Sequence, residues 1–230
     1  MIVDICDILE GVVDSIGNTI ELTNIAPGVA TSCQTKWARV PKQLVRLSDG
    51  EKWVLTDVLT DEQVEATYLG ATVPEPVLEG IFALPSPYWI TGTRLAANNE
   101  WRMATSDVAA KTPIIWLHET ISEVIFGRGA SLERSSELRL FFLDETNTKD
   151  YYTKDHRKYV VNPMQQLVDA FINAINSDSR FKSVEDFRMK TFSRFGVEQE
   201  KGVIQNILDA NLSGVELQFT LEKFKTNCKC

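Results

Sequence analysis

The chain has 230 residues, of which 43% are hydrophobic and 24% are charged, and its formal net charge is −8. This length allows one large domain or a domain with a smaller insert, and the composition is typical of a soluble chain that buries a core. The negative charge argues against general nucleic-acid binding, because phosphate backbones favour proteins rich in Lys and Arg. No apolar run approaches about eighteen residues, so we expect no membrane-spanning segment.

The N-terminal stretch has the pattern of an amphipathic helix. Residues 2–15 place apolar side chains at helical spacing, and Gly17 and Asn18 follow where we expect the helix to end. Its polar positions are acidic, so the stretch lacks the basic start of a secretory signal.

Residues 19–70 replace this helical pattern with short β-like runs. The triplet Ser48-Asp49-Gly50 separates two of these runs and predicts a hairpin turn, because Gly tolerates the positive φ of a tight turn. We expect four or five strands that form a small barrel or sandwich, inserted into a core domain made of residues 1–18 and 71–230. Such a short segment buries little core of its own, so we expect it to pack on the rest of the chain.

The region that follows alternates connections with strands. Prolines and a glycine punctuate residues 74–87, and the run VLEGIFAL within them predicts a strand. Residues 86–101 show no periodicity and predict a surface loop, and the run GRGASLERSS (127–136) predicts a polar, flexible segment. The runs PIIWLHE (113–119) and LRLFFLD (138–144) predict buried strands, and the second is apolar on both faces, as in a central strand.

The clearest helix begins at Asn162, a good N-cap residue, and Pro163, which suits the first helical position. Its apolar stripe comprises Met164, Leu167, Val168, Phe171, Ile172 and Ile175. The run FRMKTFSRFGVE then predicts a strand, and VIQNILDANL predicts a short helix. Residues 212–224 predict a closing strand with two distinct faces, of which the apolar one should lie on the helix stripe. That face comprises Val215, Leu217, Phe219 and Leu221.

Strands outnumber helices in this order of elements, and they cluster on both sides of the long helix. The sequence therefore predicts the α+β class, with a mixed or antiparallel sheet, helices packed on one face of it, and the small β-rich insert.

The search for chemistry yields no predicted catalytic, cofactor-binding or metal-binding residue. The strongest alternative is a metal-dependent hydrolase that uses Glu119, Asp144 and Glu145 as magnesium ligands near two strand ends. Against it stands a simpler interpretation, in which residues 144–150 form a polar loop. His118 is interpreted as a histidine at a strand end, and His156 as part of a solvated helical turn.

Two groups of basic residues are candidates for a local nucleic-acid patch, although solvated surface is the simpler interpretation of each. They are Arg39, Lys42 and Arg46, and Arg188, Lys190 and Arg194. The five tryptophans are scattered along the chain and are interpreted as packing and interface residues. Four cysteines are too few for a disulfide framework, and Cys228 and Cys230 supply two ligands where structural zinc needs four.

Several segments carry a resemblance to a known group of proteins. They are PIIWLHETISEVIF, LERSSELRLFFLDETN, VVNPMQQLVDAFINAI and NLSGVELQFTLE. Over roughly residues 85–224 the chain resembles structural proteins of tailed phages and prophages of Bacteroidetes-type hosts. The order of elements resembles that of tail-terminator and neck proteins, whereas the β-rich insert departs from the minimal terminator pattern.

The resemblance implies a non-enzymatic virion protein that forms a homo-oligomeric ring, expected to be hexameric, at the head–tail junction. Its implied partners are the tail tube and the head connector, and DNA would pass through the ring without specific binding. Glu216 and Glu222 on the polar face of the closing strand suggest an acidic lining of that channel. The alternative to the ring and to the hydrolase is a binding module built on the β-rich insert.

Overall fold

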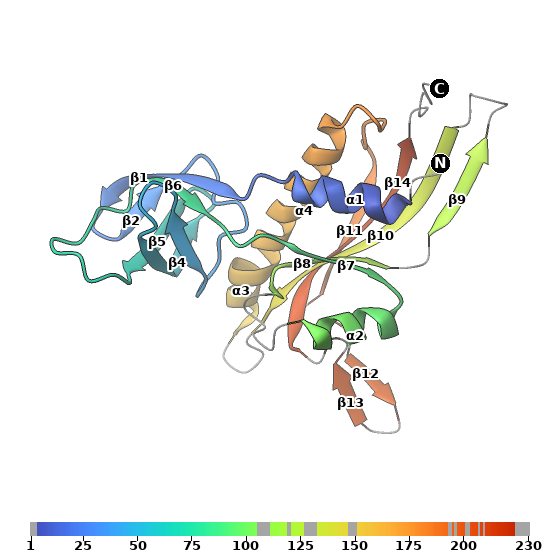
Figure 1. The fold of residues 1–230 in the computed structure, drawn as a ribbon. Helices are drawn as coiled ribbons and strands as arrows, with labels where there is room; N and C mark the ends of the chain where they lie inside the picture. The colour runs from blue at the N-terminus through green and yellow to red at the C-terminus, as the bar shows by residue number, and fades with distance from the viewer. Residues whose placement is uncertain are drawn as a thin grey trace.

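A computed structural model describes residues 4–104, 111–118, 121–126, 133–146, 151–192, 195, 197–200, 203–206, 208 and 210–223. Helices and strands both contribute, so the predicted α+β class is confirmed. Figure 1 shows a β-barrel at one end of the molecule and an open sheet at the other, with α1 (Ile5–Asp14) and α4 (Asn162–Ser177) between them.

The barrel is closed by six strands in the order β1-β2-β5-β4-β3-β6. They are β1 (Thr19–Ala26), β2 (Val29–Thr31), β3 (Gln43–Arg46), β4 (Lys52–Thr60), β5 (Gln63–Tyr68) and β6 (Gly80–Ala83). The predicted hairpin turn is present between β3 and β4, with Gly50 at φ +75°. Strand β6 pairs with β1 and β3, so the closed barrel extends beyond the expected end of the insert at residue 70.

The open sheet has six strands. Five follow the order β11-β14-β10-β8-β7, and β9 pairs with β10 beside this path. The strands are β7 (Tyr88–Gly92), β8 (Ile114–His118), β9 (Ser122–Phe126), β10 (Glu133–Glu145), β11 (Phe187–Phe192) and β14 (Leu212–Lys223). Strands β7 and β8 are parallel and the other pairs are antiparallel, so the sheet is mixed.

One continuous hydrophobic core joins the closing strand to the long helix. The ring of Phe171 in α4 lies 5.5 Å from that of Phe142 in β10 and 6.4 Å from that of Phe219 in β14. The same buried cluster includes the apolar residues of α1 and the barrel interior, among them Trp37 and Trp53. The barrel therefore shares its core with the sheet, as expected for so small a unit. We call the sheet face that contains Phe142 and Phe219 the α4 face.

The long helix α4 continues from helical turns over residues 153–161, and its N-cap is not Asn162. Helix α3 (Thr153–His156) and the π-helix η3 (Arg157–Val161) run directly into α4, and Asn162 has helical dihedrals of −62° and −48°. An N-cap residue needs an extended backbone, so that prediction was wrong. Pro163 lacks an N–H and its ring clashes with the preceding turn, and the wider π turn accommodates it inside the helix.

The opposite sheet face, here called the α2 face, carries a second buried cluster. It contains Trp116 and Phe141, together with Ala97 and Trp101 of α2 (Arg94–Met103). The loop predicted at residues 86–101 was wrong, because this segment forms β7 and α2. Thr93 begins the helix by accepting a hydrogen bond from the Ala96 N–H at 3.2 Å. The buried clusters on both sheet faces thus contain helical side chains, whereas the prediction placed all helices on one face of the sheet.

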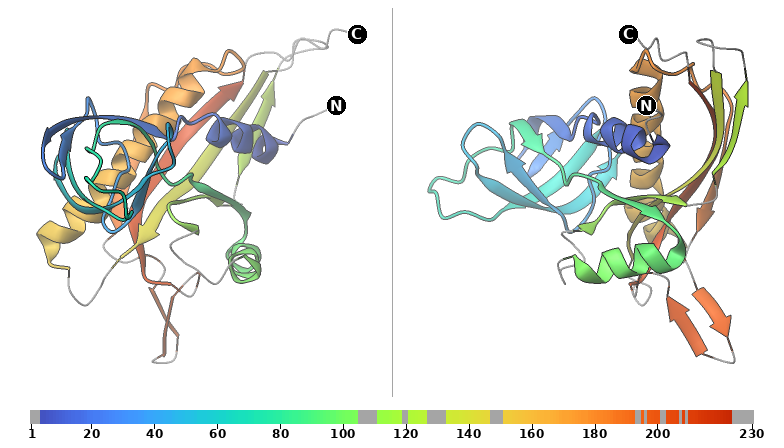
Figure 2. Two further views of the ribbon diagram at one scale, coloured as in Figure 1. Left: turned by 60° about the vertical axis from the view of Figure 1, so that its left-hand side comes forward. Right: turned by 45° about the vertical axis from the view of Figure 1, so that its right-hand side comes forward.

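Two further segments are strands where the sequence suggested otherwise. Residues 133–136, expected to be flexible, belong to β10 and pair with both β9 and β14. The predicted helix over residues 203–212 begins as β13 (Val203–Asn206), which pairs with β12 (Val197–Glu200) in a separate two-stranded sheet. Val203 and Ile204 are β-branched and favour extended structure. Figures 1 and 2 show this hairpin projecting from the body of the molecule.

Candidate assembly surface

The carboxylate of Asp144 is buried and has a structural role. Asp144 lies at the end of β10, is 1% exposed and forms an ion pair with Arg39, which is also buried. Its Oδ1 accepts a hydrogen bond from the Glu145 N–H at 2.8 Å. Burial raises the pKa of Asp144, and the positive charges of Arg39 and Lys42 oppose that shift.

This arrangement does not match the magnesium site of the hydrolase alternative. Glu145 is exposed beside the buried Asp144, because neighbouring residues of a strand point to opposite faces. Glu119 lies outside the described residues. Over the part of the chain that the structure describes, no group of three or more acidic, histidine or cysteine side chains could hold a metal ion.

The first predicted basic group is not a surface patch. Arg39 also donates to the carbonyl oxygen of Glu145 at 3.2 Å, and the buried Lys42 donates to the hydroxyl of Thr112 at 2.7 Å. Both residues belong to the barrel segment between β2 and β3, and their side chains bond to residues of the sheet domain. Together they join the barrel to the ends of β8 and β10, so neither can contact a phosphate backbone.

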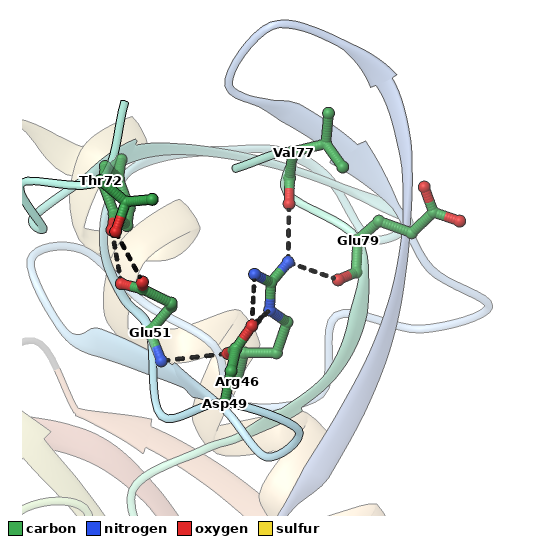
Figure 3. Close-up of polar contacts among 7 residues, drawn as sticks. Arg46, Asp49, Glu51, Thr72, Val77 and Glu79 are labelled. Atoms are coloured by element: carbon green, nitrogen blue, oxygen red, sulfur yellow. Dashed lines mark hydrogen bonds and ion pairs between the residues drawn. The ribbon is translucent and has the colours of Figure 1, made fainter. Parts of the chain in front are cut away.

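Arg46, the third member of that group, organises the barrel end shown in Figure 3. Its guanidinium donates to both carboxylate oxygens of Asp49 and to the carbonyl oxygens of Val77 and Glu79, at 2.7–3.3 Å. These hydrogen bonds hold the pKa of Asp49 below its usual value. Arg46 therefore fixes the connection between β5 and β6 against the β3–β4 hairpin.

The polar face of β14 does not form the predicted acidic lining. Glu216 is buried and forms an ion pair with Arg139, and the Gln218 side chain donates to the same carboxylate at 2.5 Å. Glu222 pairs with Lys182 at 2.7 Å. Arg139 of β10 and Lys182, which precedes β11, thus pair with these two carboxylates. The expectation was wrong for Glu216, because its side chain is buried.

The two histidines lie at the places the sequence indicated, but in different surroundings. The His118 ring, at the end of β8, lies 5.6 Å from the Trp116 ring and 6.2 Å from the Phe141 ring. His156 is half-buried, in contrast to the predicted solvated turn, and burial lowers its pKa. Four of the five tryptophans pack in the two cores, which confirms their structural role.

Strand β11 ends the sheet on one side, and among the described residues no strand pairs with its outer side. Phe187 is 37% exposed and Met189 is 43% exposed, and both lie on the α4 face because they are opposite Phe219 and Leu217. Arg188 and Lys190, from the second predicted basic group, alternate with them and are exposed on the α2 face. Arg194 lies outside the described residues.

Strand β9 forms an open margin on the other side of the same sheet, visible at the right of Figure 1. Val124 is 60% exposed and Ile125 is 55% exposed. Ile125 is opposite Arg134 and shares the α4 face, whereas Val124 is opposite Ser135 on the α2 face. Both margins of the sheet thus carry exposed apolar side chains beside strands with an unpaired edge within the described ranges.

Comparisons with known proteins do not place this chain in a family. No family model, no curated protein and no solved structure matches it. In the described part of the chain, no helix has both the length and the apolar character needed to cross a membrane.

The edge residues that make up this candidate surface could not be identified from the sequence. The alternation of Phe187, Arg188, Met189 and Lys190 was visible as a strand, but not its position at the sheet margin. That position depends on pairing with β14, which lies far along the chain.

Proposed function

We propose that this protein is a non-enzymatic structural subunit that assembles with copies of itself into a ring at the head–tail junction of a tailed phage. The observation that supports assembly is the open sheet, whose two margins each expose apolar side chains at an unpaired strand edge within the described residues. Exposed strand edges of this kind are templates for pairing with another chain, and exposed apolar patches mark interaction sites.

The location in the virion is supported by the sequence resemblance over residues 85–224. In this proposal the ring contains six copies, meets the tail tube on one side and the connector on the other, and encloses a channel for DNA. The net charge of −8 supports passage without binding, because like charges repel.

The buried ion pair also favours a structural role over the hydrolase alternative. The Asp144 carboxylate is buried against Arg39, so a metal ion would have to replace a guanidinium inside the barrel–sheet junction. The barrel shares its core with the sheet domain, and this favours an integral part of a subunit over a separable recognition module.

Imaging of labelled particles tests the proposed location. Phage particles that carry a peptide tag on this chain are incubated with gold-conjugated antibody and viewed by electron microscopy. We expect label at one level, between head and tail. Label along the whole tail, on the head, or absent from particles in which the tag is accessible would overturn the proposal.

A further inference from the structure

The two open margins belong to opposite sides of one sheet and are different surfaces. Strand β11 has six residues and β9 has five, so their lengths differ by one residue. A contact between two different surfaces is heterologous, and repeating it with a rotation that closes generates a ring. A contact of β11 with β11, or of β9 with β9, would give only a two-fold dimer.

The side chains match across such a contact. If β9 of one copy extends the sheet beyond β11 of the next, the faces continue, so Ile125 lies beside Phe187 and Met189 on the α4 face. These three exposed apolar side chains would then cover one another. Apolar cross-strand neighbours of this kind stabilise antiparallel pairs.

Charge distinguishes this contact from self-pairing of β11. Two copies of β11 in a continuous sheet would place Arg188 and Lys190 of one copy beside the same cations of the other, on one face. Like charges on neighbouring strands destabilise the pair. The five residues of β9 include one charged side chain, Glu123, so pairing with β9 brings no additional cation to Arg188 and Lys190.

We propose that β11 of one copy pairs with the outer edge of β9 of the next copy, so that the open sheets of successive subunits join around the ring. This inference rests on the proposed function, since it names the contact by which the subunits assemble. The partner is a second copy of this chain, and the contact is head-to-tail.

Cross-linking between two proteins, each with one introduced cysteine, tests the contact. The background replaces Cys33, Cys228 and Cys230 by Ser, and Cys6 remains because it is half-buried with its thiol pKa raised by burial to about 11. One protein carries Ile125→Cys and the other carries Met189→Cys. A short bismaleimide should link them when they are mixed, giving a dimer that contains both variants, and should link neither protein to itself.

A Leu95→Cys protein provides the matched control, because Leu95 is 72% exposed on α2, away from both margins. Mixed with Met189→Cys, it should give at least about tenfold less cross-linked dimer. Self-linking of Met189→Cys or Ile125→Cys alone, or equal yields with Leu95→Cys, would overturn the head-to-tail contact.

An edge charge provides a second, independent measurement. Met189→Lys adds a cation to β11, as natural sheets do to block edges, and should raise the concentration needed for assembly by about tenfold or more. Leu95→Lys should leave it unchanged, and circular dichroism checks that both variants fold. If the unmodified protein forms rings and Met189→Lys assembles equally well without the cross-link, the contact is wrong and the ring stands. If the unmodified protein forms no oligomer, with tail-tube protein present as well as absent, both proposals fail.

Discussion

Replacing Asp144 by Ala should destabilise the whole fold, because it leaves a buried cation without its partner. The Arg39 and Asp144 side chains are 4% and 1% exposed, and Arg39 keeps one described hydrogen bond, to the Glu145 carbonyl. Removing one member of a buried ion pair costs about 3–5 kcal/mol, since the remaining charge stays desolvated. For a chain of this size that loss lowers Tm by roughly 6–20 °C.

Chemical denaturation of four proteins measures this effect: the parent, Asp144→Ala, Arg39→Met and the double variant. The double variant should lose less than the sum of the two single losses, because it removes both charges together. Glu222→Ala is the control, since its pair with Lys182 is exposed on both sides, and it should cost less than about 1 kcal/mol. A loss below about 1 kcal/mol for Asp144→Ala would refute the role of this pair in joining barrel and sheet.

Three further substitutions test the packing and the electrostatics. Gly214→Ala should cost about 3 kcal/mol or more in denaturant unfolding, because Gly214 has φ +154° and an added Cβ would lie 1.9 Å from the Phe142 carbonyl oxygen; an unchanged midpoint would contradict the β10–β14 register. Phe171→Ala should cost about 3–5 kcal/mol, since its ring contacts both Phe142 and Phe219 from a fully buried position, and a loss under about 1 kcal/mol would place α4 off the sheet. Burial, and then the charge of Glu10, raise the pKa of Glu100, so the protonated form favours folding and that stability is lost as pH rises through the folded-state pKa. Glu100→Gln should therefore stabilise the protein at about pH 7 and not at about pH 4, and equal effects in unfolding curves at both pH values would count against this environment.

Elements with strong periodicity were predictable from the sequence. Helix α1, helix α4 and strand β14 each repeat apolar residues at one period over several turns or pleats, and each buries that face. The short β-like runs and the turn at Ser48-Asp49-Gly50 predicted a small barrel or sandwich. The structure shows a closed barrel, whose strand β6 lies beyond the expected limit.

Two features were missed because the local sequence signal was weak or was overridden by neighbouring residues. Helix α2 buries only Ala97 and Trp101, so its apolar signal is too sparse to stand out from a loop. Asn162 is of a residue type that is favoured at N-caps, but the helical turns that precede it override that local preference.

The buried charges and the sheet margins could not be predicted from the sequence either. In the sequence, Arg39 and Lys42 have the pattern of surface cations. In the folded chain Arg39 forms an ion pair with Asp144, and Lys42 donates a hydrogen bond to Thr112. The open edge of β11 likewise exists only because the chain adds no described strand beyond it.

The mass of the protein in solution tests the central claim, that open sheet margins assemble copies of this chain into a closed ring. Size-exclusion chromatography with light scattering is run over a range of concentrations, with and without tail-tube protein. We predict one discrete assembly whose mass is six times the 25.9 kDa of the chain. A mass of 25.9 kDa at every concentration, with tube protein present as well as absent, would contradict the account.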